Sequence, residues 1–258
     1  MKNVKNIGLG LLIPILIVIG WFYTTNYTDT PSSILPSIGI VGKAWRDMIV
    51  SGQLWQDLSV SFSRVVKGYA CSILLGGTLG ILMGMSSVIK QIFNLTTTTI
   101  RQIPMIAWIP LIILWCGIGE KSKVVIIVIA AFFPIMINTL NGVESTPSGY
   151  IEVARLYKLS NWQTFLKVYL PHALPSIFVG LKLSLGVSWM AVVASELIAA
   201  TSGIGYRMSD ARSLMRSDIV IVCMLIIGLV GIVMDKCLTF LFRVLTPWVN
   251  KNGGRANG

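Results

Sequence analysis

Hydrophobic runs long enough to cross a bilayer follow one another along most of the chain. The first covers residues 7–23, and the others lie near 65–85, 103–118, 124–140, 174–199 and 219–242. About 20 apolar residues in a helix span the hydrocarbon layer of a membrane. The pattern therefore predicts an all-α integral membrane protein with six transmembrane helices.

Glycine and proline give two of these runs their own character. Gly76, Gly80 and Gly84 recur every fourth residue in the second run, so they share one helix face. Such a face lets another helix approach closely. Pro104 and Pro110 are expected to kink the third run, which neighbouring helices tolerate inside a membrane.

A polar stretch at residues 24–60 separates the first two runs. Its apolar residues recur at helical spacing: Trp45, Met48, Ile49, Leu54, Trp55 and Leu58. This spacing predicts amphipathic helix lying at a membrane surface. The first run is too long for a typical signal peptide, and no small-x-small cleavage pattern follows it, so we expect an uncleaved first span.

The composition supports a membrane protein. The chain is 54% hydrophobic and only 12% charged, whereas soluble domains carry about 25% charged residues. The formal charge of +11 is scattered and not clustered on one face, which argues against nucleic-acid binding. We read these cations mainly as residues that set membrane orientation, with attraction of an anionic solute as the alternative.

Metal, disulfide and nucleotide chemistry find little support. Cys71, Cys116, Cys223 and Cys237 lie in or beside apolar runs without a CxxC pair, and His172 is the single histidine. The segment GIGEKSK at 117–123 resembles a P-loop only superficially, because Glu120 stands where the Walker pattern requires Gly before Lys. The chain is therefore expected to be no enzyme, and it cannot itself be an ATPase.

The distribution of basic residues predicts the orientation. Six spans put both termini on one side, and with that side cytoplasmic the inner segments hold ten Lys and Arg against seven outside. The inner ten are Lys2, Lys5, Lys90, Arg101, Arg155, Lys158, Lys167, Arg243, Lys251 and Arg255. The bias has the sign of the positive-inside rule, so we expect a multi-pass protein of the cytoplasmic (inner) membrane.

One transmembrane domain is expected over residues 1–258. It divides into a first span (1–23), an extracytoplasmic or interfacial segment (24–60) and a core (61–242). The core contains a cytoplasmic loop at 144–171.

This cytoplasmic loop reads as two short helices. Pro147 fits the start of the first helix, which carries an apolar face. Ser160 and Gln163 have the spacing of a capping box at the start of the second, which is expected to end before Pro171. Apolar faces exposed to water need cover. Either the pair packs back on its own membrane domain or on lipid, or it docks to another protein.

The same loop resembles a known family motif. Glu152, Ala154, Leu170 and Pro171 match the spacing of E-A-A-x3-G-x9-I-x-L-P in binding-protein-dependent ABC importer permeases, with Val153 and Val168 as departures. Lys158 stands where the motif has Gly. Because Gly is the residue that readily adopts left-handed backbone, the substitution predicts a turn formed differently here.

Longer stretches resemble one branch of that family. The segments 101–119, 133–143, 174–198 and 202–212 are similar to permeases for aliphatic sulfonates, taurine and nitrate, and SGIGY with the following AR is most similar to aliphatic-sulfonate permeases. The resemblance implies a type I ABC importer permease that carries aliphatic sulfonates, with nitrate, taurine or bicarbonate as alternatives. One scaffold serves several small anions.

The resemblance also implies partners. These are a second copy of the chain, two cytoplasmic ABC ATPase subunits that bind ATP and Mg, and an extracytoplasmic substrate-binding protein. The loop would be the coupling helix that docks on the ATPase. The residues it assigns to coupling are Glu152, Val153, Ala154, Leu156, Tyr157, Lys158, Leu159, Ser160, Leu170 and Pro171.

Ionisable residues inside a membrane are candidates for function. Lys182, Trp189 and Glu196 are seven residues apart on the fifth run and share a face. One interpretation is that they line a solute path between two copies of the chain. The alternative is structural: Lys182 reaches the membrane surface, and Glu196 pairs with a buried donor. We favour the second role for Glu196, because a free carboxylate repels an anion. Trp108 and Trp115 likewise line the path or pack in the core.

Other cations lie toward the outer side. Arg207, Arg212 and Arg216 occupy the loop at 201–218, where they meet an anion or its delivering protein, or are simply solvated. Arg64 and Lys67 open the second run, and we expect their side chains to reach the membrane surface.

An ion-coupled secondary transporter is the rival class. It would show inverted repeats and facing broken helices, and the sequence shows no such repeat. A membrane-embedded enzyme would need a convergent acid, base or metal group, which these residues do not supply.

Overall fold

The computed structural model describes residues 2–246, and the regular structure of this part is helical throughout. The elements are α1 (Lys2–Tyr27), α2 (Ile38–Val50), α3 (Gln53–Met85), α4 (Ser87–Ile100), α5 (Met105–Cys116), α6 (Glu120–Glu144), α7 (Ser148–Leu156), α8 (Asn161–Thr164), the π-helix η1 (Phe165–Tyr169), α9 (Leu170–Ala199), α10 (Ile204–Ser213) and α11 (Ser217–Leu245). Lys251 and Arg255, which contribute to the predicted charge bias, lie outside the described residues.

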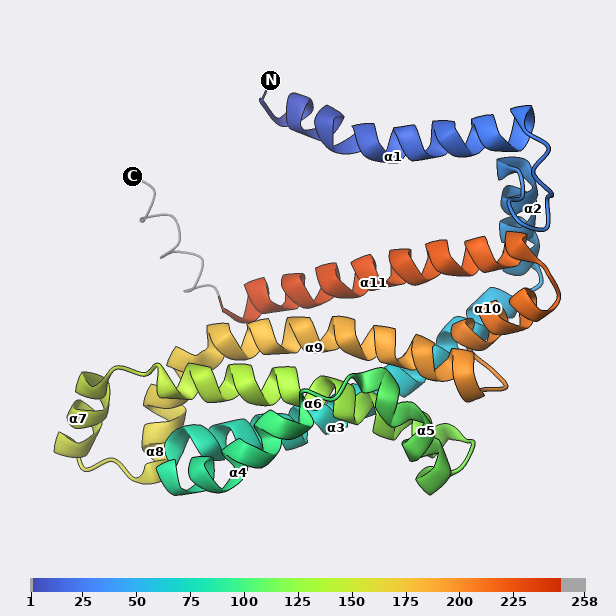
Figure 1. Cartoon of the computed structure of the whole chain (residues 1–258). Helices are drawn as coiled ribbons and strands as arrows, with labels where there is room; N and C mark the ends of the chain where they lie inside the picture. Colours follow the sequence, from blue (N-terminus) through green and yellow to red (C-terminus); the bar gives the residue numbers. More distant parts are fainter. Residues whose placement is uncertain (1, 247–258) are drawn as a thin grey trace.

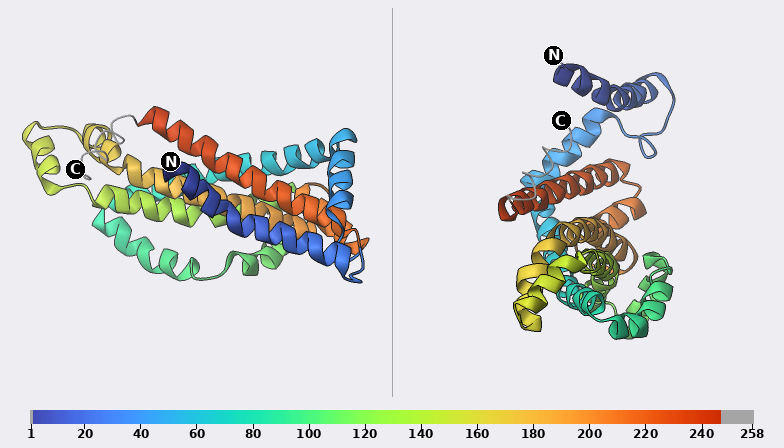
Figure 2. Two further views of the ribbon diagram at one scale, coloured as in Figure 1. Left: turned by 90° about the horizontal axis from the view of Figure 1, so that it is seen from above. Right: turned by 90° about the vertical axis from the view of Figure 1, so that its left-hand side faces the viewer.

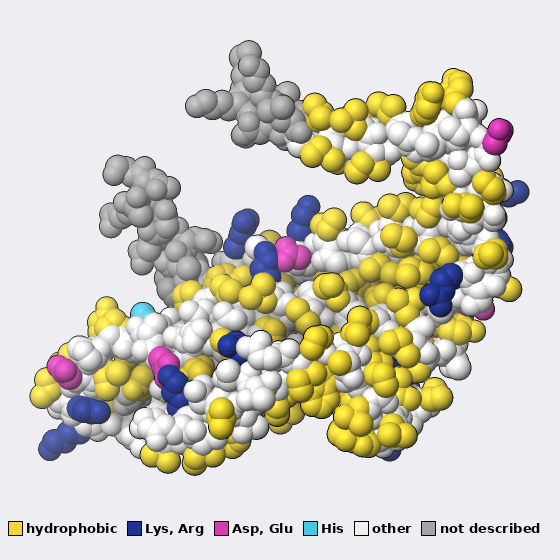
Figure 3. All heavy atoms as spheres, in the orientation of Figure 1, with side chains coloured by type: hydrophobic (Ala, Val, Ile, Leu, Met, Phe, Trp, Pro, Cys, Tyr) yellow, Lys and Arg dark blue, Asp and Glu magenta, His cyan; other side chains and the backbone are white. Residues whose placement is uncertain are grey.

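Five helical stretches of the described chain are long and apolar enough to cross a membrane. They contain α1, α3, α6, α9 and α11, which match five of the predicted spans. A sixth span is reached if the bent pair of α4 and α5 counts as one crossing. Figure 3 shows hydrophobic side chains over the outer flanks of α1 and α5, as expected for surfaces that face lipid or another membrane helix.

The third span differs from its prediction. Of residues 103–118, Met105–Cys116 form α5, which is too short to cross a membrane by itself. The chain bends by 97° between α4 and α5, just before this helix. Pro104 caps α5 in extended backbone, and a proline disfavours helix in the residue before it. Pro110 lies inside α5. The prolines therefore predicted where the helix is disrupted, but the predicted kink is smaller than the bend that the structure shows.

The centre of the molecule is the packing of α3, α6 and α9, which run side by side in Figures 1 and 2. A Cβ added at Gly80 would lie 2.6 Å from the carbonyl oxygen of Met136, and one at Gly76 would lie 2.8 Å from that of Phe132. The two backbones thus touch where the glycines stand. The predicted close approach of a helix to this face is confirmed, and the partner is α6.

Short elements lie at two ends of the molecule, with α7 and α8 at one end and α2 and α10 at the other (Figure 1). We call them the α7–α8 end and the α2–α10 end. At the second, Val41, Ala44 and Met48 of α2 are buried in the cluster that includes residues of α11, and Ser37 caps α2. The predicted amphipathic segment is therefore helical, and α2 buries its apolar face on protein. α1 stands apart from the core and meets it mainly through its last turns (Figures 1 and 2).

Candidate functional site

The turn between α7 and α8 is left-handed at a lysine. Lys158 has a φ of 51°. The amide of Leu159 donates to the carbonyl of Ala154 at 3.0 Å, and the amide of Lys158 donates to that of Arg155 at 2.9 Å. These two bonds form a Schellman motif, which normally places glycine at this position. The prediction of a differently formed turn is wrong: the backbone keeps the glycine conformation despite the side chain.

The second helix of the loop begins as predicted and ends differently. Ser160 and Gln163 form the capping box, with each side chain bonded to the other's backbone amide. The helix does not end before Pro171. It passes through the π-helix η1 and continues as α9. Pro171 cannot donate a backbone hydrogen bond and crowds the preceding turn, and the wider π-turn lies directly before it. α8 therefore lies across the end of α9 in Figure 1.

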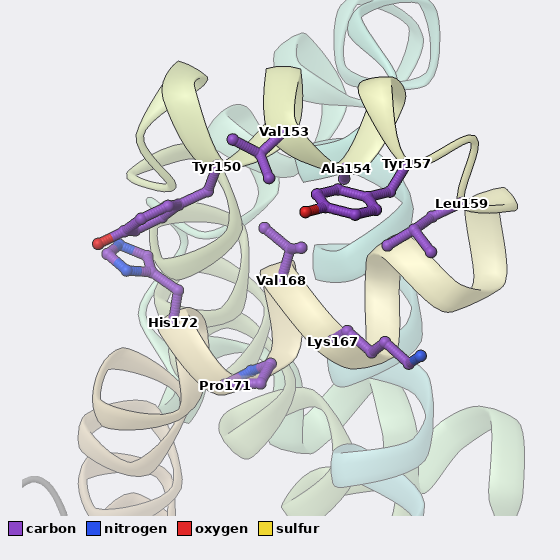
Figure 4. A pocket seen from close by; sticks show the side chains of 9 residues that line it. All are labelled: Tyr150, Val153, Ala154, Tyr157, Leu159, Lys167, Val168, Pro171 and His172. Atoms are coloured by element: carbon purple, nitrogen blue, oxygen red, sulfur yellow. The ribbon is translucent and has the colours of Figure 1, made fainter.

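The α7–α8 end carries an uncovered apolar surface. Leu156 is 80% exposed and Tyr157 is 77% exposed, whereas Ala154 is buried. A groove of about 450 Å³ separates α7 from η1 and the start of α9. Figure 4 shows the ring of Tyr150 beside the imidazole of His172 at its mouth.

The groove brings together both halves of the predicted coupling motif. Its lining from that set is Val153, Ala154, Tyr157, Leu159 and Pro171. Glu152, Leu156, Lys158 and Ser160 lie on the exposed outside, and Leu170 begins α9. Lys167 and His172 also line the groove and were not predicted. Lys167 directly precedes Val168 and His172 directly follows Pro171, so their adjacency to motif positions was the available signal for them.

The α2–α10 end holds a buried ion-pair network. Arg64, which is 1% exposed, binds Glu196 with Nη1 to Oε1 at 2.6 Å and also pairs with Glu120. Its Nη1 donates to the carbonyl of Ser202 at 2.8 Å. Ser61 donates to the Glu196 carboxylate at 2.8 Å. The prediction that Arg64 reaches the membrane surface is wrong, because α3, α6, α9 and the α9–α10 loop converge on its guanidinium.

The glycines of SGIGY fit this network. The amide of Gly205 donates to Oε2 of Glu196 at 3.0 Å, and that of Ile204 donates to Ser61 at 3.0 Å. Gly203 has a φ of +107°, and a Cβ there would lie 2.5 Å from the Glu196 carboxyl carbon. Only glycine satisfies both constraints. The start of α10 is thus built around one buried carboxylate.

The stripe of Lys182, Trp189 and Glu196 faces other helices of the same chain. Lys182 pairs with Asp235 of α11 at 3.1 Å, and the indole of Trp189 donates to the carbonyl of Ile227 at 2.9 Å. Glu196 is enclosed by the network described above. For Glu196, this is the arrangement of the structural alternative, since its carboxylate pairs with buried donors.

The two tryptophans of α5 have different surroundings. Trp108 lines a groove of about 320 Å³ between α5, α6 and α9, together with Arg101 and Val187. Trp115 is exposed near the end of α5. The two residues therefore do not share one environment.

The three arginines of the outer loop are also distinct. Arg207 binds Asp57 with Nε to Oδ2 at 2.8 Å. Burial lowers the pKa of the Arg207 guanidinium, but the hydrogen bond to Asp57 raises it, and the pKa ends above its usual value. Arg216 pairs with Asp218 at 2.7 Å, and Arg212 is exposed. Among the described residues, no group of three or more His, Cys, Asp or Glu side chains is arranged to hold a metal ion.

The chain is similar to known transport proteins. A family model described as "Binding-protein-dependent transport system inner membrane component" matches residues 72–251. SsuC of Bacillus subtilis (strain 168), named for aliphatic sulfonates transport, is 35% identical over 95% of this chain and 89% of its own length. NrtB of Leptolyngbya laminosa, a nitrate import permease protein, is 34% identical over 81% of this chain and 78% of its own.

The fold is similar to that of a solved transporter. A chain of the inward-facing methionine ABC transporter MetNI superposes with a TM-score of 0.61 at 17% sequence identity. The match covers 74% of this chain and 96% of that one. At this identity the likeness concerns the fold.

Proposed function

Because this chain belongs to the family of binding-protein-dependent transport system inner membrane components, we propose that it is the permease through which aliphatic sulfonates enter the cell. The family makes it a multi-pass inner membrane protein and the non-catalytic membrane subunit of an ABC transporter. ATP is bound by the partner ATPase, and this chain needs no cofactor of its own. The family assignment removes the alternative of an ion-coupled secondary transporter.

The uncovered surface of α7 carries the coupling part of the proposal, and the similarity to SsuC supports the cargo. The side chains of Leu156, Tyr157 and Tyr150 at α7 are exposed, and no other part of the described chain covers them. Large exposed apolar side chains at one end of a protein mark an interaction surface. The helix is held by a Schellman motif on one side of the turn and a capping box on the other. A rigid projection of this kind suits the transfer of motion from an ATPase into α9, which follows α8 and η1 without a break.

The remaining assembly follows from the same proposal. Two copies of the chain form the path, two ATPase subunits bind α7 in the cytoplasm, and a binding protein delivers substrate at the α2–α10 end. Arg212 is exposed there and is available to such a partner. Nitrate is the second candidate cargo, since NrtB is 34% identical to this chain.

The test is reconstitution of this chain with its candidate ATPase and binding protein. ATP hydrolysis is measured with an alkanesulfonate, taurine, nitrate and bicarbonate. We expect stimulation by the alkanesulfonate and taurine above that by nitrate. Stimulation by nitrate alone would assign the chain to nitrate, and no stimulation by any anion would contradict the proposed cargo class.

A variant in α7 tests the coupling role. Leu156→Asp places a charge on an 80% exposed side chain, so the fold should be retained while the apolar contact is lost. We expect the ATPase to co-purify with native chain and not with Leu156→Asp. Val50→Asp, at a 78% exposed position of the opposite end, is the matched control and should co-purify normally. Equal recovery with both variants would show that α7 is not the contact.

A further inference from the structure

The broken span leaves a crevice between α4–α5 on one side and α6 and α9 on the other. One part, of about 320 Å³, is lined by Arg101, Trp108, Phe133, Ile137 and Val187 among others. A second part, of about 200 Å³, is lined by Lys90, Asn94, Arg101, Ile137 and Glu144 among others. Arg101 and Ile137 line both parts, which are therefore neighbours. Figure 2 shows the backbone of α4 and α5 arching away from α6 and α9.

The wider part of the crevice lies near the middle of the membrane helices. Phe133 is the fourteenth of the 25 residues of α6, and Val187 is the eighteenth of the 30 residues of α9. Both helices are candidate spans. A solute held against these two residues would therefore be about halfway across the bilayer.

The crevice has one cation without a counter-ion. Lys90 is neutralised by Glu144, with Nζ at 2.6 Å from Oε1. Arg101 forms none of the ion pairs found within residues 10–246. Lys90, Asn94 and Thr97 of α4 and Arg101 at its C-cap recur at helical spacing and line the narrower part. The predicted orientation counted Arg101 among the cytoplasmic cations, but the structure places it in the same lining as Phe133 and Val187 of the membrane helices. A polar stripe that ends in a guanidinium at this position favours a solute path over a lipid contact.

The walls of the wider part are apolar. Trp108, Phe133, Ile137 and Val187 surround the space next to Arg101. The combination of one guanidinium and an apolar wall complements a monoanion that carries a short aliphatic chain. Nitrate has no apolar part to use this wall.

We propose that this crevice is the membrane-embedded binding site for the transported anion, with Arg101 binding the charged head group and the wall at Trp108 and Val187 receiving the aliphatic chain. The inference rests on the proposed function and narrows it, because the site selects an alkanesulfonate over nitrate. The guanidinium presents parallel N–H donors that match the oxygens of a sulfonate. The Lys182 stripe lies on a different face of α9, toward α11.

The experiment measures equilibrium binding of radiolabelled butanesulfonate to the purified permease–ATPase complex. The binding protein is left out, so that only the membrane site is read. We expect saturable binding to native complex and a Kd at least about tenfold higher in Arg101→Gln, since a charge-assisted hydrogen bond is lost. Lys67→Gln, which removes another exposed cation of a membrane helix, is the control and should bind like native complex.

A second variant tests the wall independently. Val187→Phe fills the space beside Arg101. It should weaken the binding of butanesulfonate more than the binding of methanesulfonate. Unlabelled nitrate should compete poorly with both sulfonates. An unchanged Kd in Arg101→Gln, or equal losses for the two chain lengths in Val187→Phe, would overturn the site. Native complex that transports an alkanesulfonate but shows no saturable binding would overturn only this site. Native complex that transports none of the anions would overturn the proposed function.

Discussion

Lys158 is one of two non-glycine residues with left-handed backbone in the part of the chain that the structure describes, the other being Met215. Both stand at the same place in a Schellman motif, since the amide of Arg216 donates to the carbonyl of Ala211 at 2.8 Å, as that of Leu159 does to Ala154. A side chain in this conformation is disfavoured by about 1–2 kcal/mol. The hydrogen bonds of the motif therefore hold a strained turn in place between α7 and α8.

This strain predicts the effect of restoring glycine. Lys158→Gly should stabilise the turn by about 1 kcal/mol. Amide hydrogen exchange of residues 154–160 should then slow by about fivefold. Lys158→Ala removes the charge but keeps the Cβ, and should leave exchange near the native rate. Equal slowing in both variants would show that the charge, and not the backbone, governs the turn.

At the scale of elements, the closest contact is that between α3 and α6. Four glycines of α3 each leave room for a residue of α6: Gly68, Gly76, Gly80 and Gly84. Their regular spacing is what allowed a close helix approach to be predicted from the sequence. The identity of the partner helix could not be read in the same way. Several runs of the chain offer equally apolar faces, and only their arrangement in space selects one.

The contact predicts a contrast between two neighbouring glycines. Gly80→Ala would place a Cβ 2.6 Å from the carbonyl oxygen of Met136, so the helices must separate. Overpacking of this kind costs about 1–3 kcal/mol, and the thermal unfolding midpoint in detergent should fall. Gly77→Ala meets no atom within 4 Å and should leave the midpoint unchanged. A similar fall in both variants would show that the contact with α6 is not responsible.

At the scale of the whole molecule, the elements at its two ends suit two different compartments. The α7–α8 end presents an apolar, capped projection, whereas the α2–α10 end closes over the buried pairs of Arg64 with Glu196 and Asp57 with Arg207. Removing one partner of a buried pair leaves an uncompensated charge. These ion pairs therefore tie α3 to α9 and α10 at the α2–α10 end.

The proposed orientation predicts opposite labelling of the two ends. In a variant without the native cysteines, a membrane-impermeant maleimide added to intact cells should label Ser51→Cys and spare Ser148→Cys. Both positions are exposed, at the α2–α10 and α7–α8 ends respectively. Labelling of both residues after permeabilisation is the control for reactivity. The reverse pattern in intact cells would place the termini outside.

The sequence by itself determined the class of protein, five of the spans, the glycine face of α3 and the capping box at Ser160. Each of these depends on residues close together in the chain, where helical spacing and local hydrogen bonding decide the outcome. Tertiary structure decided what Arg64 and Glu196 do, because their pairing joins residues 132 positions apart. It also decided that α4 and α5 form a bent helix pair with Arg101 between them, since composition alone cannot distinguish a kink from a bend of 97°. Long-range pairing depends on which surfaces meet, and no local pattern records that.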